Sequence, residues 1–191
     1  AKGGRTVLFV SHNMGAINQL CRTAILMTQG RVRKTGDIQS VIASYLAADT
    51  RDQNPRIIEP TVSRKGNGAM RFSRIALSDE AGLASNLFEL DQSASICFEA
   101  VVNGGVENLS AGLVIKTITG NPVTVIIDKD CGHQLEISGG KVGARIYLES
   151  LPFFPGKYTI DLWVGSDDGR ITFDHVEQVA SFEITNNNRV S

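Results

Sequence analysis

The side chains best suited to hold a ligand lie on one short stretch of alternating polarity, 157–164. The side chains of a strand point alternately to its two faces, so the apolar set of this stretch faces one way and Asp161 and Trp163 face the other. An indole ring can pack on the C–H face of a sugar, and a carboxylate can accept hydrogen bonds from sugar hydroxyls. A pair of this kind on an open sheet face would suit a ligand that presents both apolar C–H groups and hydroxyls. The apolar set comprises Tyr158, Ile160, Leu162 and Val164.

Three further side chains are expected at outward-facing strand positions. Lys116 points outward if its neighbours Leu113 and Ile115 point into a core. Arg145 and Tyr147 alternate with apolar residues and are expected to face solvent in the same way. The two cations of this set could favour an acidic terminal sugar. The predicted carbohydrate-binding residues are Trp163, Asp161, Lys116, Tyr147 and Arg145.

A structural role competes with binding at each of these positions. The only tryptophan of a sandwich can serve in the core or in a dimer contact, which leaves Trp163 open to that interpretation. Lys116 and Arg145 can be ordinary solvated surface, and Tyr147 can pack against a neighbouring strand.

No arrangement of residues predicts catalysis or a metal site. A glycosidase needs two opposed carboxylates roughly 5–9 Å apart, and only Asp161 with Glu99 or Glu149 is a conceivable pair. The three cysteines are far apart and lack CxxC or Cys/His ligand spacing, so we expect no catalytic residue and no metal in this chain. They are Cys21, Cys97 and Cys131.

Composition places the chain among globular proteins and suggests two units. Of its 191 residues, 42% are hydrophobic and 20% charged, and the net charge of −1 provides no electrostatic footprint for nucleic acid. Residues 1–50 carry a net charge of +4, however, and the remainder −5. Sparse cysteines favour a reducing compartment, and no apolar run approaches the ~20 residues that span a bilayer. We interpret the chain as part of a longer protein, because its first residues resemble mid-domain strand.

The first 49 residues alternate strand and helix. An apolar run over 6–10 predicts a strand buried on both faces, and 14–22 predicts a helix. A hairpin is expected over 24–34, and Asp37 is placed to cap a last helix. Residues 50–68 are polar and rich in proline and glycine, which predicts a linker.

Residues 69–191 predict a second, all-β domain. Eight β-rich runs recur between turn residues, with no convincing helix. The sequence Pro155-Gly156-Lys157-Tyr158 before a strand also looks like a tyrosine corner. The expected fold is mainly β: an immunoglobulin-like antiparallel β-sandwich preceded by a small α/β fragment. The expected strands lie at about 69–79, 93–103, 109–119, 122–128, 133–138, 143–150, 157–165 and 170–184.

The stretch 4–14, GRTVLFVSHNM, resembles the switch region of ABC-transporter ATPases, where a strand ends in Ser-His. The resemblance continues in order through Gln29-Gly30-Arg31-Val32 to VIASYL at 41–46. It implies that 1–49 is the end of an ABC ATPase domain in which His12 would reach the nucleotide's γ-phosphate. The GxxxxGK[ST] loop, the signature motif and the Asp-Glu strand are absent from this sequence, so we expect no ATP hydrolysis here. ATP and magnesium would be cofactors of the full-length subunit only.

The SHNM variant together with VIASYL looks closest to the nucleotide-binding subunits of polysaccharide exporters. Some subunits of the O-antigen group carry a carboxy-terminal β-sandwich that binds the non-reducing end of the glycan, and residues 64–184 are similar to it. This implies an O-antigen polysaccharide as ligand and the exporter's transmembrane subunit as partner. It also implies a homodimer formed through the last strand, and a cytoplasmic location, peripheral on the inner membrane.

Two other functions remain open for the sandwich. It could be a protein–protein adaptor that docks another export component, or an accessory of a glycan-active enzyme. The shape and polarity of the face around Trp163 and Asp161 distinguish the adaptor from a glycan-binding domain.

Overall fold

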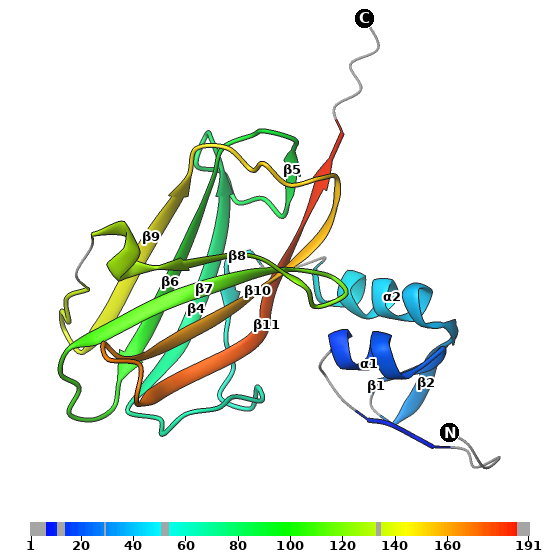
Figure 1. The fold of residues 1–191 in the computed structure, drawn as a ribbon, viewed down its shortest axis with the longest axis horizontal. Helices are drawn as coiled ribbons and strands as arrows, with labels where there is room; N and C mark the ends of the chain where they lie inside the picture. The colour runs from blue at the N-terminus through cyan, green and yellow to red at the C-terminus, as the bar shows by residue number, and fades with distance from the viewer. Residues whose placement is uncertain (1–6, 11–13, 29, 51–53, 133–134, 187–191) are drawn as a thin grey trace, which may run out of the picture.

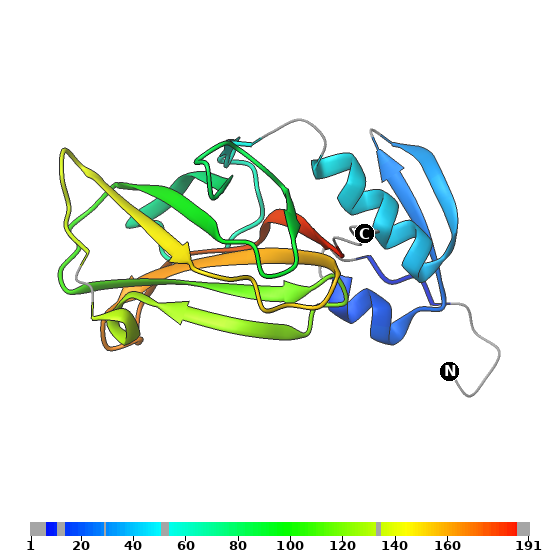
Figure 2. The ribbon, with the colours of Figure 1, turned by 90° about the horizontal axis from the view of Figure 1, so that it is seen from above.

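The computed structural model describes residues 7–10, 14–28, 30–50, 54–132 and 135–186. Its main body is a sandwich of two β-sheets that lie face to face, as the view from above shows (Figure 2). A small α/β fragment lies beyond one end of the sandwich and covers neither outer sheet face (Figures 1 and 2).

The α/β fragment follows the predicted order of elements. The Asp37 carboxylate accepts a hydrogen bond from the Ser40 amide at 2.9 Å, which caps the second helix as expected. Val41 and Ile42 on this helix are buried, and Ile42 packs against Ile118 of the sandwich. The elements are α1 (Met14–Leu20), β1 (Thr23–Thr28), β2 (Arg31–Asp37) and α2 (Ile38–Thr50), with β1 and β2 forming an antiparallel pair.

The strand predicted over 6–10 is not present in the described part of that run. Residues 7–10 pair with no strand among the described residues, and Val10 and Leu8 are 95% and 85% exposed. An apolar run of this kind is typical of a parallel strand with neighbours on both sides. No described strand lies beside it, so it stays extended and uncovered.

The two sheets confirm the predicted antiparallel sandwich. The five-stranded sheet has the order β5-β11-β10-β7-β8, and the four-stranded sheet has the order β3-β4-β6-β9. All pairs are antiparallel except β5 with β11. The five-stranded sheet is built from β5 (Leu87–Glu89), β7 (Leu109–Thr117), β8 (Pro122–Ile127), β10 (Gly156–Ser166) and β11 (Thr172–Thr185). The four-stranded sheet is built from β3 (Arg56–Ile57), β4 (Met70–Asp79), β6 (Ala94–Val102) and β9 (Lys141–Leu148).

One predicted strand, 133–138, is wrong where the structure describes it. Residues 135–137 are irregular, and Ser138 makes only an isolated bridge to Lys141. Before this segment the chain forms a short 3-10 helix, η1 (Asp128–Cys131). The segment is glycine-flanked and lacks a partner strand, so a β-rich composition alone does not make it a strand.

The core is formed by the inward-facing residues that alternation predicts. Ile160, Leu162 and Val164 of β10 are at most 1% exposed. Phe72 and Phe98, from β4 and β6, pack edge to face with ring centroids 5.5 Å apart.

The predicted tyrosine corner is present. The Tyr158 hydroxyl donates to the Phe154 carbonyl oxygen at 2.6 Å, and burial of this side chain raises its pKa. The ring also stacks on Phe182 of β11, with centroids 5.4 Å apart. The corner thus fixes the chain where it enters β10.

The sandwich begins before residue 69, inside the stretch predicted to be a linker. Asn54 bonds to the amide and carbonyl of Leu77 through its side chain, and Ile58 is buried in the core. Residues 65–68 cross the N-terminal end of β11. There an alanine at Gly66 would place its Cβ 2.5 Å from the Phe173 carbonyl oxygen. Only a glycine permits this approach at a φ of +118°.

A buried ionic cluster joins this crossing segment to both sheets. The Asp174 carboxylate of β11, with no exposed surface, accepts from Arg64 at 2.8 Å and from Arg71 at 3.1 Å. It also accepts the backbone amide of Phe72 at 2.8 Å, at the point where β4 shifts register against β6. One carboxylate therefore links the crossing segment, β4 and β11.

We predict that Asp174→Ala destabilises the fold by about 3–5 kcal/mol, because the guanidinium of Arg64 would stay buried without its counter-charge. The measurement is the free energy of unfolding from urea denaturation. Glu183→Gln is the matched control, since its pair with Lys157 at 3.6 Å is solvent-exposed and should contribute less than about 1 kcal/mol. Equal losses for the two variants would contradict the importance of the buried cluster.

Candidate functional site: the outer face of the five-stranded sheet

The five predicted binding residues divide between opposite faces of the sandwich. Lys116, Asp161 and Trp163 lie on β7 and β10 and share the outer face of the five-stranded sheet. Arg145 and Tyr147 lie on β9, on the outer face of the four-stranded sheet. The five side chains therefore do not share one surface, because two sheets and the core separate the two groups.

The first group belongs to a continuous set of rows that we call the Trp163 face. One row across the sheet runs from Lys65 through His175 to Trp163, because Lys65 bridges to His175 and His175 pairs with Trp163. Paired residues on neighbouring strands point to the same face. The Trp163 face comprises Lys65, Val114, Lys116, Val125, Asp161, Trp163, His175 and Glu177.

The indole of Trp163 is fixed in place at the sheet surface. Its Nε1 donates to the Thr172 Oγ1 at 3.3 Å. The ring also lies over Gly165, where an added Cβ would come within 2.4 Å of the indole Cζ2. The side chain is partly exposed, in agreement with the outward position predicted from alternation.

Asp161 points to the predicted face but is not available to solvent. It is 2% exposed, and its carboxylate contacts Lys116 Nζ at 2.5 Å and accepts the Gln178 amide at 2.8 Å. The cause is a bulge in β11: Ile160 pairs with Ala180 and Leu162 with Val176, so the residues between them face Asp161 alone. The carboxylate satisfies the amide that the interrupted ladder leaves unpaired.

A second ion pair lies beside the first. Lys65 Nζ contacts Glu177 at 2.9 Å, and the hydrogen bond between them raises the pKa of Lys65. The same hydrogen bond holds the pKa of Glu177 below its ordinary value, with His175 and Lys116 adding to the effect. The negative charge of Asp161 also raises the pKa of Lys65. The two pairs and His175 therefore form one electrostatic group.

The side of the face toward β8 is apolar. Val114 pairs with Asp161 on one side and with Val125 on the other, and Val125 is 56% exposed. The Trp163 face thus has an ionic half over β11 and an aliphatic half over β8, with the indole beside both.

The other predicted pair has a different environment. Tyr147 is 70% exposed, and the Arg145 guanidinium donates to the Cys97 sulfur at 3.2 Å across the β6–β9 pair. This interaction raises the pKa of Arg145. Both side chains face outward as predicted, but no aromatic ring held like Trp163 is found among the described residues near them.

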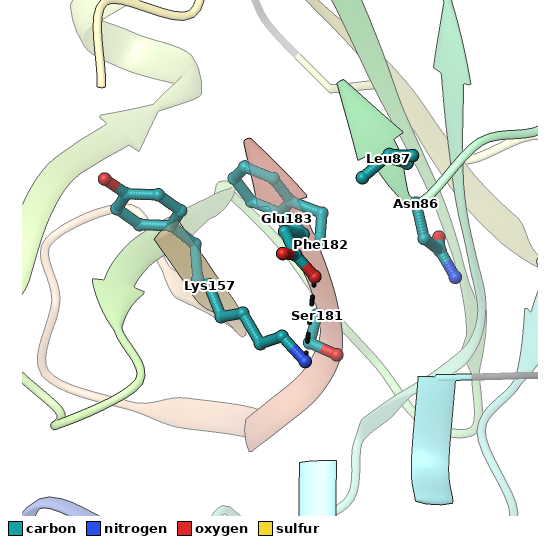
Figure 3. Close-up of a pocket in the computed structure, with 7 residues that line it drawn as sticks. Asn86, Leu87, Lys157, Ser181, Phe182 and Glu183 are labelled. Atoms are coloured by element: carbon teal, nitrogen blue, oxygen red, sulfur yellow. Dashed lines mark ion pairs between the residues drawn. The ribbon is translucent and has the colours of Figure 1, made fainter. Parts of the chain in front are cut away.

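A pocket lies farther along the same outer sheet face, near the C-terminal end of β11. Figure 3 shows the ion pair of Lys157 with Glu183 on one side of it and Asn86 and Leu87, at the start of β5, on the other. It is the place where the parallel strand β5 joins the sheet. The residues that line it include none of the five predicted binding residues.

The Trp163 face can bind a polyhydroxylated ligand without catalysing a reaction on it. An indole offers a flat apolar platform, and paired charges offer both donors and acceptors to hydroxyls. Among the described residues, no cluster of His, Cys, Asp and Glu could hold a metal ion. The predicted nucleotide-switch residue, His12, lies outside the described residues.

Sequence reasoning missed Lys65 and Glu177. The position of Lys65 depends on the crossing segment, and that of Glu177 on the bulge in β11. Neither a crossing segment nor a bulge produces a periodic pattern in the sequence. His175 could have been found, because it alternates with Asp174 and must point to the opposite side.

The two sheets, their order and the tyrosine corner define the class of the protein as an immunoglobulin-like β-sandwich domain with an α/β fragment before it. Residues 61–191 match the family described as the Wzt C-terminal domain, and the chain belongs to that family. The resemblance predicted for the sandwich is thereby confirmed at the level of the family.

Individual relatives agree with this assignment. The chain is 31% identical over 78 residues to the teichoic acids export ATP-binding protein TagH of Bacillus cereus. The match covers 41% of this chain and only 14% of that relative's length.

Within the described part of the chain, no helix combines the length and hydrophobicity that crossing a membrane requires.

Two solved structures show how the fold compares. The crystal structure of the C-terminal domain of wzt has a TM-score of 0.58 at 16% identity and covers 68% of this chain and 82% of its own. This likeness shows the fold alone. A Niemann-Pick type C2 protein from the Japanese carpenter ant reaches a TM-score of 0.45 at 11% identity, over 65% of this chain and 99% of its own.

We predict that Gly165→Ala displaces the Trp163 ring and destabilises the sandwich by about 1–3 kcal/mol, because the new Cβ would overlap the indole and the Ile171 carbonyl. The emission maximum of the single tryptophan and the thermal midpoint report the two effects. Gly105→Ala is the control, because nothing lies within 4 Å of a Cβ at that position. An unchanged emission spectrum for Gly165→Ala would show that the ring is not held as described.

We also predict that the Glu177 carboxyl titrates below its ordinary pKa and that Lys65→Met raises its pKa, because the hydrogen bond from Lys65 is lost. Because the pKa of Glu177 is lower in the folded state, this carboxyl stabilises the fold at any pH above its unfolded pKa of about 4.3. The contribution is lost as the pH falls from there through the folded pKa. NMR titration of the side-chain carboxyl measures the shift. An identical Glu177 pKa in the wild type and in Lys65→Met would refute the pairing.

Proposed function

We propose that the sandwich is the carbohydrate-binding domain of an ABC transporter's ATP-binding subunit and that it recognises the non-reducing terminus of an O-antigen polysaccharide for export. Membership of the Wzt C-terminal domain family and the partial match to an export ATP-binding protein support the context. The arrangement of the Trp163 face supports the ligand class.

The observation that carries the proposal is an immobilised aromatic ring beside two ion pairs on an outer sheet face. Trp163 is held by Thr172 and Gly165, while Lys116 and Glu177 remain partly exposed at 28% and 20%. A sugar stacked on the indole would bring its hydroxyl rim toward these charged groups, because they lie on the same sheet face. Binding of this kind needs no cofactor in this chain.

The two alternative functions fit the face less well. An enzyme would need two opposed carboxylates over one sugar, yet Asp161 lies on one sheet and Glu99 on the other, while Glu149 follows a strand of that other sheet. Asp161 is also buried in an ion pair. A protein-docking surface is expected to be broadly apolar, whereas half of this face consists of charged side chains.

The wider context belongs to the same proposal. Residues 1–49 would be the end of the ATPase domain and 69–191 would belong to the binding domain, whose sandwich begins within the connecting stretch 50–68. His12 would act at the nucleotide of the complete subunit. That subunit would use ATP and magnesium, form a homodimer, and bind a transmembrane subunit at the cytoplasmic side of the inner membrane.

The test compares one exposed aromatic on each outer sheet face. Trp163→Ala should weaken binding of the source strain's O-antigen polysaccharide by about 30-fold, or ~2 kcal/mol, because the stacking platform is lost. Tyr147→Ala, on the four-stranded sheet, should bind like the wild type. Isothermal titration calorimetry measures both, and circular dichroism checks that each variant is folded.

The opposite pattern would contradict the proposal. Loss of binding in Tyr147→Ala with retention in Trp163→Ala would move the site to the four-stranded sheet. Absence of any binding by the wild type would refute the carbohydrate-binding function.

A further inference from the structure

We infer that the Trp163 face takes a neutral saccharide terminus and excludes termini that carry a carboxylate or phosphate. This inference rests on the proposed function, because it specifies the ligand of the same site. It replaces the expectation that Lys116 and Arg145 favour an acidic terminal sugar.

One lysine of the Trp163 face is already neutralised. Lys116 contacts Asp161 at 2.5 Å, and Asp161 is 2% exposed. An anionic ligand that drew Lys116 away would leave this buried carboxylate with only the Gln178 amide as partner. Removing one member of a buried ion pair is unfavourable, so Lys116 cannot serve an anion at low cost.

The second lysine of the face, Lys65, is also paired with a carboxylate, although its side chain is 71% exposed. Lys65 donates to Glu177, and the charge of Asp161 also acts on it. An acidic sugar approaching Lys65 would therefore meet the Glu177 carboxylate, and the charge of Asp161 would add to the repulsion. Neutral hydroxyls have no such penalty, because they can donate to the carboxylates and accept from the lysines simultaneously.

The remaining cations around this sheet are paired as well, among the residues that the structure describes. Lys129, Lys157 and Arg170 each lie within 3.6 Å of a carboxylate oxygen. Carboxylates outnumber cations over the strands and loops of this region, so its field repels anions. The carboxylates are Asp128, Asp130, Asp161, Asp167, Asp168, Glu177 and Glu183, and the cations are Lys65, Lys116, Lys129, Lys157 and Arg170.

The guanidinium that could have bound an acid is on the wrong side. Arg145 lies on β9 of the four-stranded sheet, with its Nε directed to the Cys97 sulfur. The core of the sandwich separates it from Trp163. No arginine of the described residues belongs to the Trp163 face, and arginine is the side chain best suited to two-point recognition of carboxylate or phosphate.

The experiment uses matched pairs of oligosaccharides that differ only at C6 of the non-reducing terminal residue, where the neutral member has a hydroxymethyl group and the acidic member a carboxylate or a phosphate ester. Glucose is compared with glucuronic acid, galactose with galacturonic acid, and mannose with mannose 6-phosphate. Quenching of Trp163 fluorescence and calorimetry report binding by the 191-residue chain. For every pair that binds, we expect the neutral member to bind about tenfold more tightly or better.

Asp161→Asn should largely abolish this preference. The asparagine Oδ1 can still accept the Gln178 amide, while Lys116 loses its counter-charge. Affinity for the acidic members should then rise by about tenfold. Glu183→Gln is the matched control, because it changes the net charge equally but frees Lys157, which belongs to the pocket near β5. This control should keep the wild-type preference.

A second variant protects the test against misfolding of the first. Lys116→Met combined with Asp161→Asn removes both charges of the pair, and it should retain the preference for neutral members. Circular dichroism establishes which variants are folded.

The outcomes separate this inference from the function on which it rests. Equal or tighter binding of acidic members by the wild type, with quenching of Trp163, would overturn the inference and leave the carbohydrate-binding function standing. A folded Asp161→Asn without a gain for acidic members would overturn the role given to the Lys116–Asp161 pair. If neither the oligosaccharides nor the O-antigen polysaccharide bind the wild type, both proposals fail.

Discussion

The buried carboxylate of Asp174 is the interaction on which the arrangement of the sandwich depends. It receives Arg64 from the crossing segment, Arg71 from β4 and the Phe72 amide from the opposite sheet. A charge in the core is tolerated only when such partners surround it. Because Arg64 is fixed there, the next residue is placed beside β11, and this puts Lys65 on the outer face within reach of Glu177. A structural ion cluster thus positions one end of the candidate site.

The bulge in β11 has the corresponding role at the centre of the site. A regular ladder would have given Asp161 a cross-strand neighbour and left its carboxylate exposed. The bulge instead presents the backbone amide of Gln178 to that carboxylate, and Lys116 on β7 forms an ion pair with it. The same irregularity brings Glu177 onto the face. Bulges of this kind commonly redirect side chains near functional surfaces. The charge pattern of the face is therefore a result of backbone geometry as much as of residue types.

The sequence was a good guide wherever a period of two decides the outcome. Alternation correctly oriented Trp163 outward and Leu162 inward, and the Pro-Gly-x-Tyr motif correctly predicted the tyrosine corner. Alternation says only whether a side chain points in or out, however, and not to which of the two sheets its strand belongs. For that reason alternation alone does not reveal that Arg145 and Tyr147 lie across the core from Trp163. The burial of Asp161 depends on an irregular register, which has no signature in local sequence.

The way in which Trp163 is held affects the thermodynamics of whatever it contacts. A free tryptophan on a sheet loses rotamer freedom when a ligand stacks on it, and this loss opposes association. Here the bond to Thr172 and the contact over Gly165 have already selected one orientation during folding. The rotamer entropy of Trp163 is therefore lost when the domain folds. Ligand binding does not lose it a second time, so the loss does not weaken the affinity. A preorganised ring of this kind allows a small contact area, such as a single terminal residue of a polymer, to be recognised with useful strength.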